Sequence, residues 1–137
     1  MIKLLIACSQ TVTPTFEAIT EEVIGSYAPD PSKDLPASFI CEVICADTKS
    51  GSEWGRRLGI PIWYELVTRE DTKHGKYLGV RMRNRRLADR ADAALLFWDG
   101  LSENVSDVAC RMLARGKPCR VVPTKKRAPK NPRSRDR

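Results

Sequence analysis

A-D-A-A-L-L-F-W-D-G, residues 91–100, is the stretch that decides the fold of this chain. Its apolar run is too short to span a membrane, has no amphipathic helical spacing and ends in the turn pair Asp99-Gly100. Such a run is typical of a strand that is buried on both faces of a parallel sheet. We therefore expect it to be the central strand of an α/β domain.

A helix is expected directly after this strand, with Ser102 as its N-cap and Arg115 near its end. Sheets of α/β proteins bind ligands where a strand end meets a helix N-terminus, because the free N–H groups there attract anions. This junction is therefore the first place where we expect a binding site.

Strands and helices alternate along the rest of the chain, which predicts βαβ units and a parallel sheet. The other expected strands are Ile2–Ala7, Ser38–Cys45, Ile60–Val67 and Cys119–Val122. Three other helices are expected: one with Pro14 in its first turn, one that starts at Ser50 or Ser52, and one that covers Val80–Arg90. Between the last two, Thr68–Gly79 is expected to be a polar loop. Pro61 favours an edge position for the third strand. We predict one Rossmann-like three-layer domain, residues 1–123, with a five-stranded, mainly parallel sheet.

The net charge of +7 is concentrated at the C-terminus. Residues 124–137 hold seven of the 24 basic side chains and one of the 17 acidic ones, so that the first 123 residues are nearly neutral. This segment has no apolar residue except Ala128 and contains two prolines, which predicts a disordered basic tail. Non-specific contact with nucleic acid through the tail is one expectation, and a merely solubilising role is another.

Five cysteines are an odd number, and the only histidine is His74. Cys41 and Cys45 have no second pair at zinc-ligand spacing, so we expect no metal site and reduced thiols in a cytoplasmic protein. The opening apolar run, Leu4–Ala7, is too short for a signal peptide core or a membrane span, and no membrane partner is expected. The oligomeric state stays open, and a homo-oligomer is compatible with the sequence.

The candidate binding residues follow from the rule that ligands bind at the carboxyl ends of parallel strands. Hydroxyl side chains and loop N–H groups there suit phosphate or ribose oxygens, and Trp98 offers a flat face for a base. A cleft-facing Arg83 can hold phosphate through two hydrogen bonds, although the arginines of residues 81–90 also fit a solvated basic face. Cys8 also fits a small buried residue. The candidates are Cys8, Ser9, Gln10, Asp47, Thr48, Arg83, Asn84, Trp98, Asp99, Gly100 and Ser102.

No catalytic constellation stands out, and the catalytic residues are unknown. His74 has no visible orienting partner, and the chain lacks both G-x-x-x-x-G-K-[ST] and a G-x-G-x-x-G after the first strand. We expect no required cofactor.

Several motifs share one resemblance: W-G-x-x-x-G-I-P-I at 54–62, H-G-K-x-x-G-x-x-x-R-N at 74–84, A-D-A-A-L-L-F-W-D-G-x-S at 91–102 and G-K-P at 116–118. With them, residues 41–122 resemble the YspA-like branch of the SLOG superfamily. The resemblance implies a Rossmann-like domain that binds a nucleotide-derived ligand, such as a nucleotide, ADP-ribose or a dinucleotide. It also implies that six residues contribute to the site, namely Arg83, Asn84, Trp98, Asp99, Gly100 and Ser102.

Part of that family's phosphate-binding segment is changed here. The family has a segment like G-G-A-x-G-A-D after its second strand, whereas residues 42–48 read E-V-I-C-A-D-T. The family's Gly-Thr after the fourth strand is Asn104-Val105, and its Gly and Arg in the first loop are Cys8 and Gln10. Because glycine lets the backbone approach phosphate closely, these changes imply a diverged ligand preference or a lost ligand.

Two other functions stay open. The first is cleavage of an N-glycosidic bond, with Asp99 or Glu103 stabilising an oxocarbenium-like centre or acting as nucleophile. Related families place a glutamate near the position of Val108, for which Asp107 is an imperfect substitute. The second is nucleic-acid or protein binding through the basic tail and the arginines of residues 81–90. A phage or mobile-element origin is a further expectation.

Overall fold

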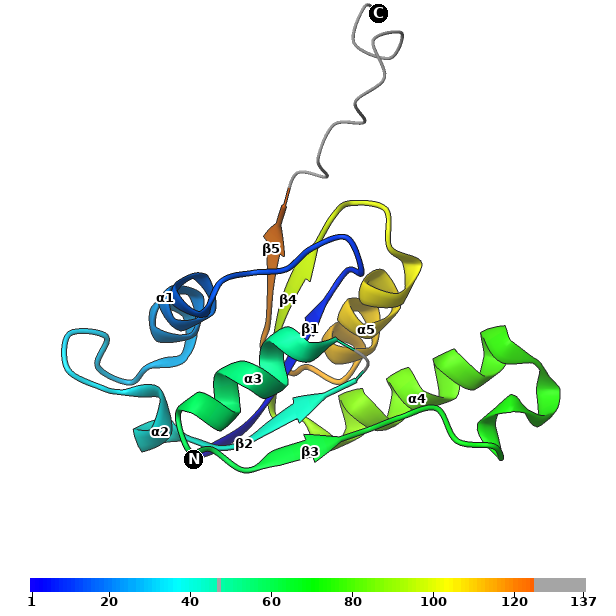
Figure 1. Cartoon of the computed structure of the whole chain (residues 1–137), viewed down its shortest axis with the longest axis horizontal. Coiled ribbons are helices and arrows are strands. Elements are labelled where there is room, and N and C mark those ends of the chain that lie inside the picture. Colours follow the sequence, from blue (N-terminus) through cyan, green and yellow to red (C-terminus); the bar gives the residue numbers. More distant parts are fainter. Residues whose placement is uncertain (47, 125–137) are drawn as a thin grey trace, which may run out of the picture.

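The computed structural model confirms an α/β fold built on one five-stranded sheet, and it describes residues 1–46 and 48–124 (Figure 1). All strand pairs are parallel, and the strand order is β3-β2-β1-β4-β5. The strands are β1 (Ile2–Cys8), β2 (Ile40–Cys45), β3 (Ile62–Tyr64), β4 (Ala93–Trp98) and β5 (Cys119–Pro123). Asp47 and residues 125–137, and with them nearly all of the predicted tail, lie outside the described residues.

The centre of the sheet is β1, and the prediction that the run at 91–100 forms the central strand is wrong. This run forms β4, which lies between β1 and β5. Its interior burial is as expected, since Ala93–Phe97 are all buried. Each interior strand of a sheet covered on both faces has a buried apolar run, so burial alone cannot single out the middle one.

Helices cover both faces of the sheet and give the three predicted layers (Figure 1). On one face, α1 (Phe16–Tyr27) and α3 (Lys49–Arg57) pack against alternate side chains of β1 such as Leu4 and Ile6. On the other face, α4 (Lys76–Arg90) and α5 (Glu103–Ala114) pack against the intervening Leu5 and Ala7. Successive side chains of β1 therefore point to opposite faces of the sheet and pack into two separate cores.

Helix starts differ from the predicted ones by a few residues. Thr15 caps α1 by accepting a hydrogen bond from the N–H of Ala18, so Pro14 lies before the helix. Thr48 holds the N-cap position of α3, ahead of the two serines that were expected to start this helix. A short helix, α2 (Pro36–Phe39), occupies the predicted start of the second strand, with proline in its first turn.

The third strand is shorter than predicted and ends at Tyr64. It is an edge strand, as Pro61 indicated, and its neighbour β2 ends at Cys45. Among the described residues, one further ladder bond continues the pairing, from the N–H of Glu65 to the carbonyl of Cys45. The chain then leaves the sheet because no strand remains for it to pair with.

The predicted polar loop at 68–79 contains a 3₁₀ helix, η1 (Asp71–His74), and the first turn of α4. Asp71 is buried, accepts the N–H of Thr68 and pairs with Arg86 of α4. A Cβ atom on Gly79 would lie 3.0 Å from the carbonyl oxygen of Asp71, so glycine lets η1 lie directly on α4. The glycine that looked like a loop residue is therefore a packing residue inside a helix.

Among residues 1–46 and 48–124, no helix has both the length and the apolar character that a membrane crossing requires.

Candidate functional site

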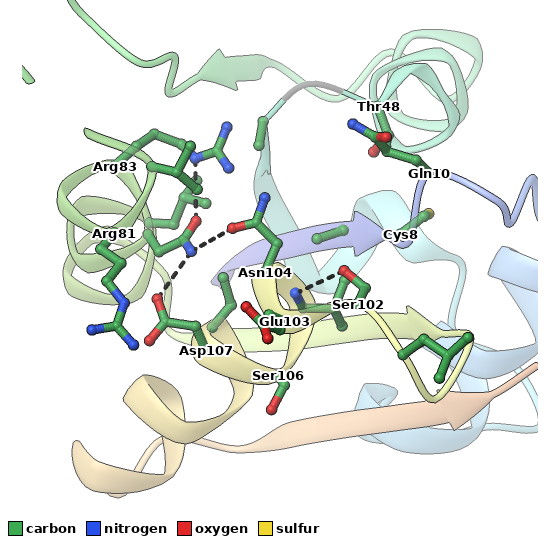
Figure 2. A pocket seen from close by; sticks show the side chains of 18 of the residues that line it. Cys8, Gln10, Thr48, Arg81, Arg83, Ser102, Glu103, Asn104, Ser106 and Asp107 are labelled. Atoms are coloured by element: carbon green, nitrogen blue, oxygen red, sulfur yellow. Dashed lines mark hydrogen bonds between the residues drawn. The ribbon is translucent and has the colours of Figure 1, made fainter. Parts of the chain in front are cut away.

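A cavity of about 1030 Å³ opens at the carboxyl edge of the sheet, beside α4 and α5 (Figure 2). The crossover connections change sides between β1 and β4, because α1 covers one face and α5 the other. The loops that follow β1 and β4 therefore leave in opposite directions and open a crevice between them. We call this space the α4–α5 cavity.

Seven of the predicted site residues line this cavity, and they come from four different parts of the chain. They are Cys8, Gln10, Thr48, Arg83, Asn84, Asp99 and Ser102. Ser9, Trp98 and Gly100 do not line it, and Asp47 lies outside the described residues.

Ser9 joins the loop after β1 to the end of β4. Its N–H donates to the carbonyl of Phe97 at 2.9 Å, and its Oγ accepts the N–H of Asp99 at 3.0 Å. Thr11 donates its hydroxyl to Oδ2 of the same Asp99 at 2.7 Å. The two loops that form this side of the cavity are thus connected by three hydrogen bonds.

Asp99 organises the turn that leads into α5. Its Oδ1 accepts the N–H groups of Leu101 and Ser102, both at 2.8 Å. The hydrogen bond from Thr11 and these two N–H groups lower the pKa of Asp99 to about 2. The carboxylate is therefore charged at neutral pH, and both of its oxygens already hold the turn.

Trp98 has a structural role in the same turn. It is half-buried against the core under α4 and α5, and its Nε1 donates to the carbonyl of Ser102 at 3.0 Å. Gly100 has a φ of 83°, which explains why glycine occupies that turn position. Neither residue offers a surface to the cavity.

Arg83 and Asn84 form the buried end of a polar network between α4 and α5. Nε of Arg83 donates to Oδ1 of Asn84, whose Nδ2 donates to Asn104 at 2.9 Å and to Asp107 at 3.0 Å (Figure 2). Arg111 donates to the same Asp107 carboxylate. Arg83 is 2% exposed and Asn84 is 1% exposed, so this pair forms part of the cavity wall.

The arginines of α4 do not form one solvated face, and that alternative interpretation is wrong. Arg83 is buried, Arg86 pairs with two carboxylates, and Arg90 holds Glu42 through two hydrogen bonds of 2.7 and 2.9 Å. Arg81 and Arg85 are exposed, and only Arg81 of these two lines the cavity.

Opposite walls of the cavity carry different chemistry. Arg81 and Arg83 lie on one side, and Gln10 and Thr48 lie on the other (Figure 2). The α4 wall thus supplies guanidinium groups, which suit phosphate, while the opposite wall supplies a hydroxyl and an amide. The first two turns of α5 add the carboxylates of Glu103 and Asp107, which can accept hydrogen bonds from sugar hydroxyls.

Two lining residues were missed because residues 68–79 were interpreted as a loop. Lys76 and Tyr77 belong to the first turn of α4 and line the cavity together with Val80 and Arg81. Positions 76, 80, 83, 84 and 87 share one helix face, so extending the helical period backward from Arg83 would have found the first turn.

Cys8 shows the properties of a small buried residue. It is 6% exposed, and burial raises the pKa of its thiol to about 11, while hydrogen bonds with Thr48 and Ser50 act in the opposite direction. The thiol is therefore protonated at neutral pH and is a weak nucleophile.

In the described part of the chain, no cluster of three or more His, Cys, Asp or Glu side chains is arranged to hold a metal ion. Comparison with models of protein families, with curated proteins and with solved structures found no match to this chain.

Proposed function

We propose that the protein binds a nucleotide or a nucleotide-derived ligand, such as ADP-ribose or a dinucleotide, in the α4–α5 cavity. The observation that carries the proposal is the position of this cavity at the crossover between β1 and β4, with cations on one wall and hydroxyl and amide groups on the other. Its volume is at the upper end of the range typical of small-ligand pockets, about 300–1,000 Å³.

The α4 wall accounts for phosphate binding. Arg81 is exposed and Arg83 is buried, so the two guanidinium groups lie at different depths of the same cavity. A guanidinium donates two parallel hydrogen bonds to phosphate, and burial strengthens such contacts because fewer waters compete. Lys76 adds a third cation to this wall.

The resemblance to the YspA-like SLOG domains supports the same proposal. Its R-N motif is Arg83-Asn84, and both residues lie in the cavity wall. The glycine-rich segment that is missing from the sequence would follow β2, where Ala46 and Thr48 line the cavity instead. We therefore assign phosphate to the α4 side and sugar hydroxyls to the Thr48 side.

The test is calorimetric titration of the purified protein with AMP, ADP, ADP-ribose and NAD⁺, together with thermal shift measurements. Arg81→Ala removes a cavity cation, and Arg85→Ala is its matched control, since Arg85 is exposed on the same helix but does not line the cavity. We expect Arg81→Ala to weaken binding by about tenfold and Arg85→Ala to change it by less than about twofold. If the wild-type protein binds none of the four compounds, the proposal is wrong.

A second candidate function, cleavage of an N-glycosidic bond, is favoured by the carboxylates that α5 places in the same cavity. Asp99 is held by the turn and Asp107 by Asn84 and Arg111, which leaves Glu103 in the first turn of α5 as the best candidate. Incubation with AMP and NAD⁺, followed by chromatography for released base, tests this function.

Glu103→Gln should abolish such a release. Glu17→Gln is the control, because Glu17 also lies in the first turn of a helix, α1, but does not line the cavity. No released base with the wild-type protein, or equal release by both variants, would exclude this role of Glu103.

The third function, nucleic-acid binding through residues 124–137, stays a prediction from charge, since all but Thr124 of that segment lie outside the described residues. Deleting residues 125–137 should abolish salt-sensitive binding of DNA or RNA if the tail carries it.

A further inference from the structure

We propose that Tyr77 is the platform on which the planar base of the ligand stacks. The inference rests on the proposed function, because it assigns the base end of the same ligand. Tyr77 is the one aromatic side chain among the described residues that line the α4–α5 cavity. It is the second residue of α4 and is 60% exposed, so its ring lies at the opening of the cavity.

The surroundings of Tyr77 suit a flat, aromatic group. The guanidinium carbon of Arg81, one helical turn later, lies 4.9 Å from the centroid of the Tyr77 ring. Leu101 is 67% exposed and lines the same cavity. A base stacked on the tyrosine would therefore gain contact with a ring, a neighbouring cation and an apolar side chain.

The other aromatic side chains are less suitable. Trp98, which the sequence favoured for this role, donates its Nε1 to Ser102 and does not line the cavity. Trp63 and Tyr64 are exposed, but they belong to the edge strand β3 and do not line the cavity either.

The different burial of Tyr77 and Arg83 predicts how the ligand is oriented in the cavity. Tyr77 is exposed at the opening, whereas Arg83 is 2% exposed in the cavity wall. A nucleotide would therefore place its base at the opening and a phosphate inward, against Arg83. Because every base has a flat face, stacking at an open rim discriminates weakly between bases, and we expect AMP, GMP and CMP to bind with similar affinity.

The test compares ligands with and without a base. Calorimetry would measure the binding of ADP, NAD⁺ and ribose 5-phosphate to the wild-type protein and to Tyr77→Ala, Tyr77→Leu and Tyr77→Phe. We expect Tyr77→Ala and Tyr77→Leu to weaken ADP and NAD⁺ binding by about 5- to 100-fold and to leave ribose 5-phosphate within about twofold. Tyr77→Phe keeps the ring and should bind all three as the wild type does. Tyr64→Ala is the control for loss of an exposed tyrosine outside the cavity.

The outcomes separate this inference from the proposed function. If the wild type binds ADP or NAD⁺ and Tyr77→Ala binds them equally well, the base does not stack on Tyr77, although the proposal of nucleotide binding in the cavity remains supported. An equal loss for ribose 5-phosphate, or an equal loss in Tyr77→Phe, would also overturn stacking. If ribose 5-phosphate is too weak to measure, the contrast between Tyr77→Phe and the two ring deletions decides. No binding of ADP or NAD⁺ by the wild type would overturn both statements.

Discussion

The two faces of the sheet use the same strands for different purposes. On the α1–α3 face the helices lie so close to the strands that a Cβ atom on Gly51 would be 2.9 Å from Cβ of Ile6, and one on Gly55 would be 2.6 Å from Cδ1 of Ile62. The α4–α5 face packs its own apolar core, in which Leu5, Leu96 and Met112 are fully buried, but it also holds a buried Arg-Asn pair and a cavity of about 1030 Å³. Both faces thus contribute stability, and the α4–α5 face also leaves a space that can hold a ligand.

The largest expected change in the free energy of unfolding is on the α1–α3 face. Trp54 of α3 is 1% exposed, and its Nε1 donates to Thr20 of α1 at 2.9 Å. Trp54→Ala should lower the free energy of unfolding by about 3–5 kcal/mol because it leaves a large cavity, as urea titration would measure. Trp63→Ala, at a 41% exposed tryptophan, is the control and should cost far less. Equal losses would contradict the idea that Trp54 lies in a tightly packed core.

The next effect concerns the polar network of the α4–α5 face. Asn84→Ala removes the acceptor of Arg83 and a donor to Asp107, so it should cost about 1–3 kcal/mol in the free energy of unfolding. Asn104→Ala, at the exposed end of the network, should cost less. The comparison would fail if Asn84→Ala were as damaging as Trp54→Ala, since the polar network would then contribute as much stability as the packed core around Trp54.

A smaller effect should appear at low pH, at the turn that bounds the cavity. Folding lowers the pKa of Asp99 from 3.8 to about 2, so the carboxylate contributes stability that is complete above pH 3.8 and is lost as the pH falls toward 2. Asp99→Asn lacks this contribution. Urea unfolding should therefore show a gap between wild type and Asp99→Asn that narrows from pH 5 to pH 2. A gap that stays constant would mean that the charge of Asp99 does not support the turn.

The smallest effect is on thiol accessibility. Burial raises the pKa of Cys8 to about 11 and that of Cys45 to about 12, whereas Cys110 is exposed and lines the cavity. A thiol reagent at neutral pH should therefore label Cys110 first and reach Cys8 and Cys45 only after unfolding, as mass spectrometry would show. ADP should slow the labelling of Cys110. Early labelling of Cys8 would show that the cavity wall around this residue opens in the folded protein.

Apolar runs were sufficient to predict five strands and a parallel sheet, because a strand buried on both faces has a simple pattern. They could not predict which strand is central, since β1 and β4 are equally buried. The strand order follows from which crossover takes which face, and that depends on contacts between distant segments.

The site was predictable where topology alone decides it. Thr48 and Ser102 follow strand ends and reach the cavity, as does Cys8, which is the last residue of β1 and not part of the exit loop as expected. Trp98 also lies at a strand end, but its hydrogen bond to Ser102 depends on a turn geometry that the residue pattern does not contain. Tyr77 was missed for a different reason: the polar composition of residues 68–79 indicated a loop, and the close contact of η1 with α4 at Gly79 is visible only in three dimensions.

The hydrogen bonds that connect Ser9, Thr11 and Asp99 have a kinetic consequence. They hold the loops after β1 and β4 in one arrangement before any ligand arrives. No slow ordering of these segments should precede or follow the encounter, so stopped-flow traces should show a single phase whose rate rises linearly with ligand concentration. Removing the Thr11 hydroxyl would then introduce a second, concentration-independent phase.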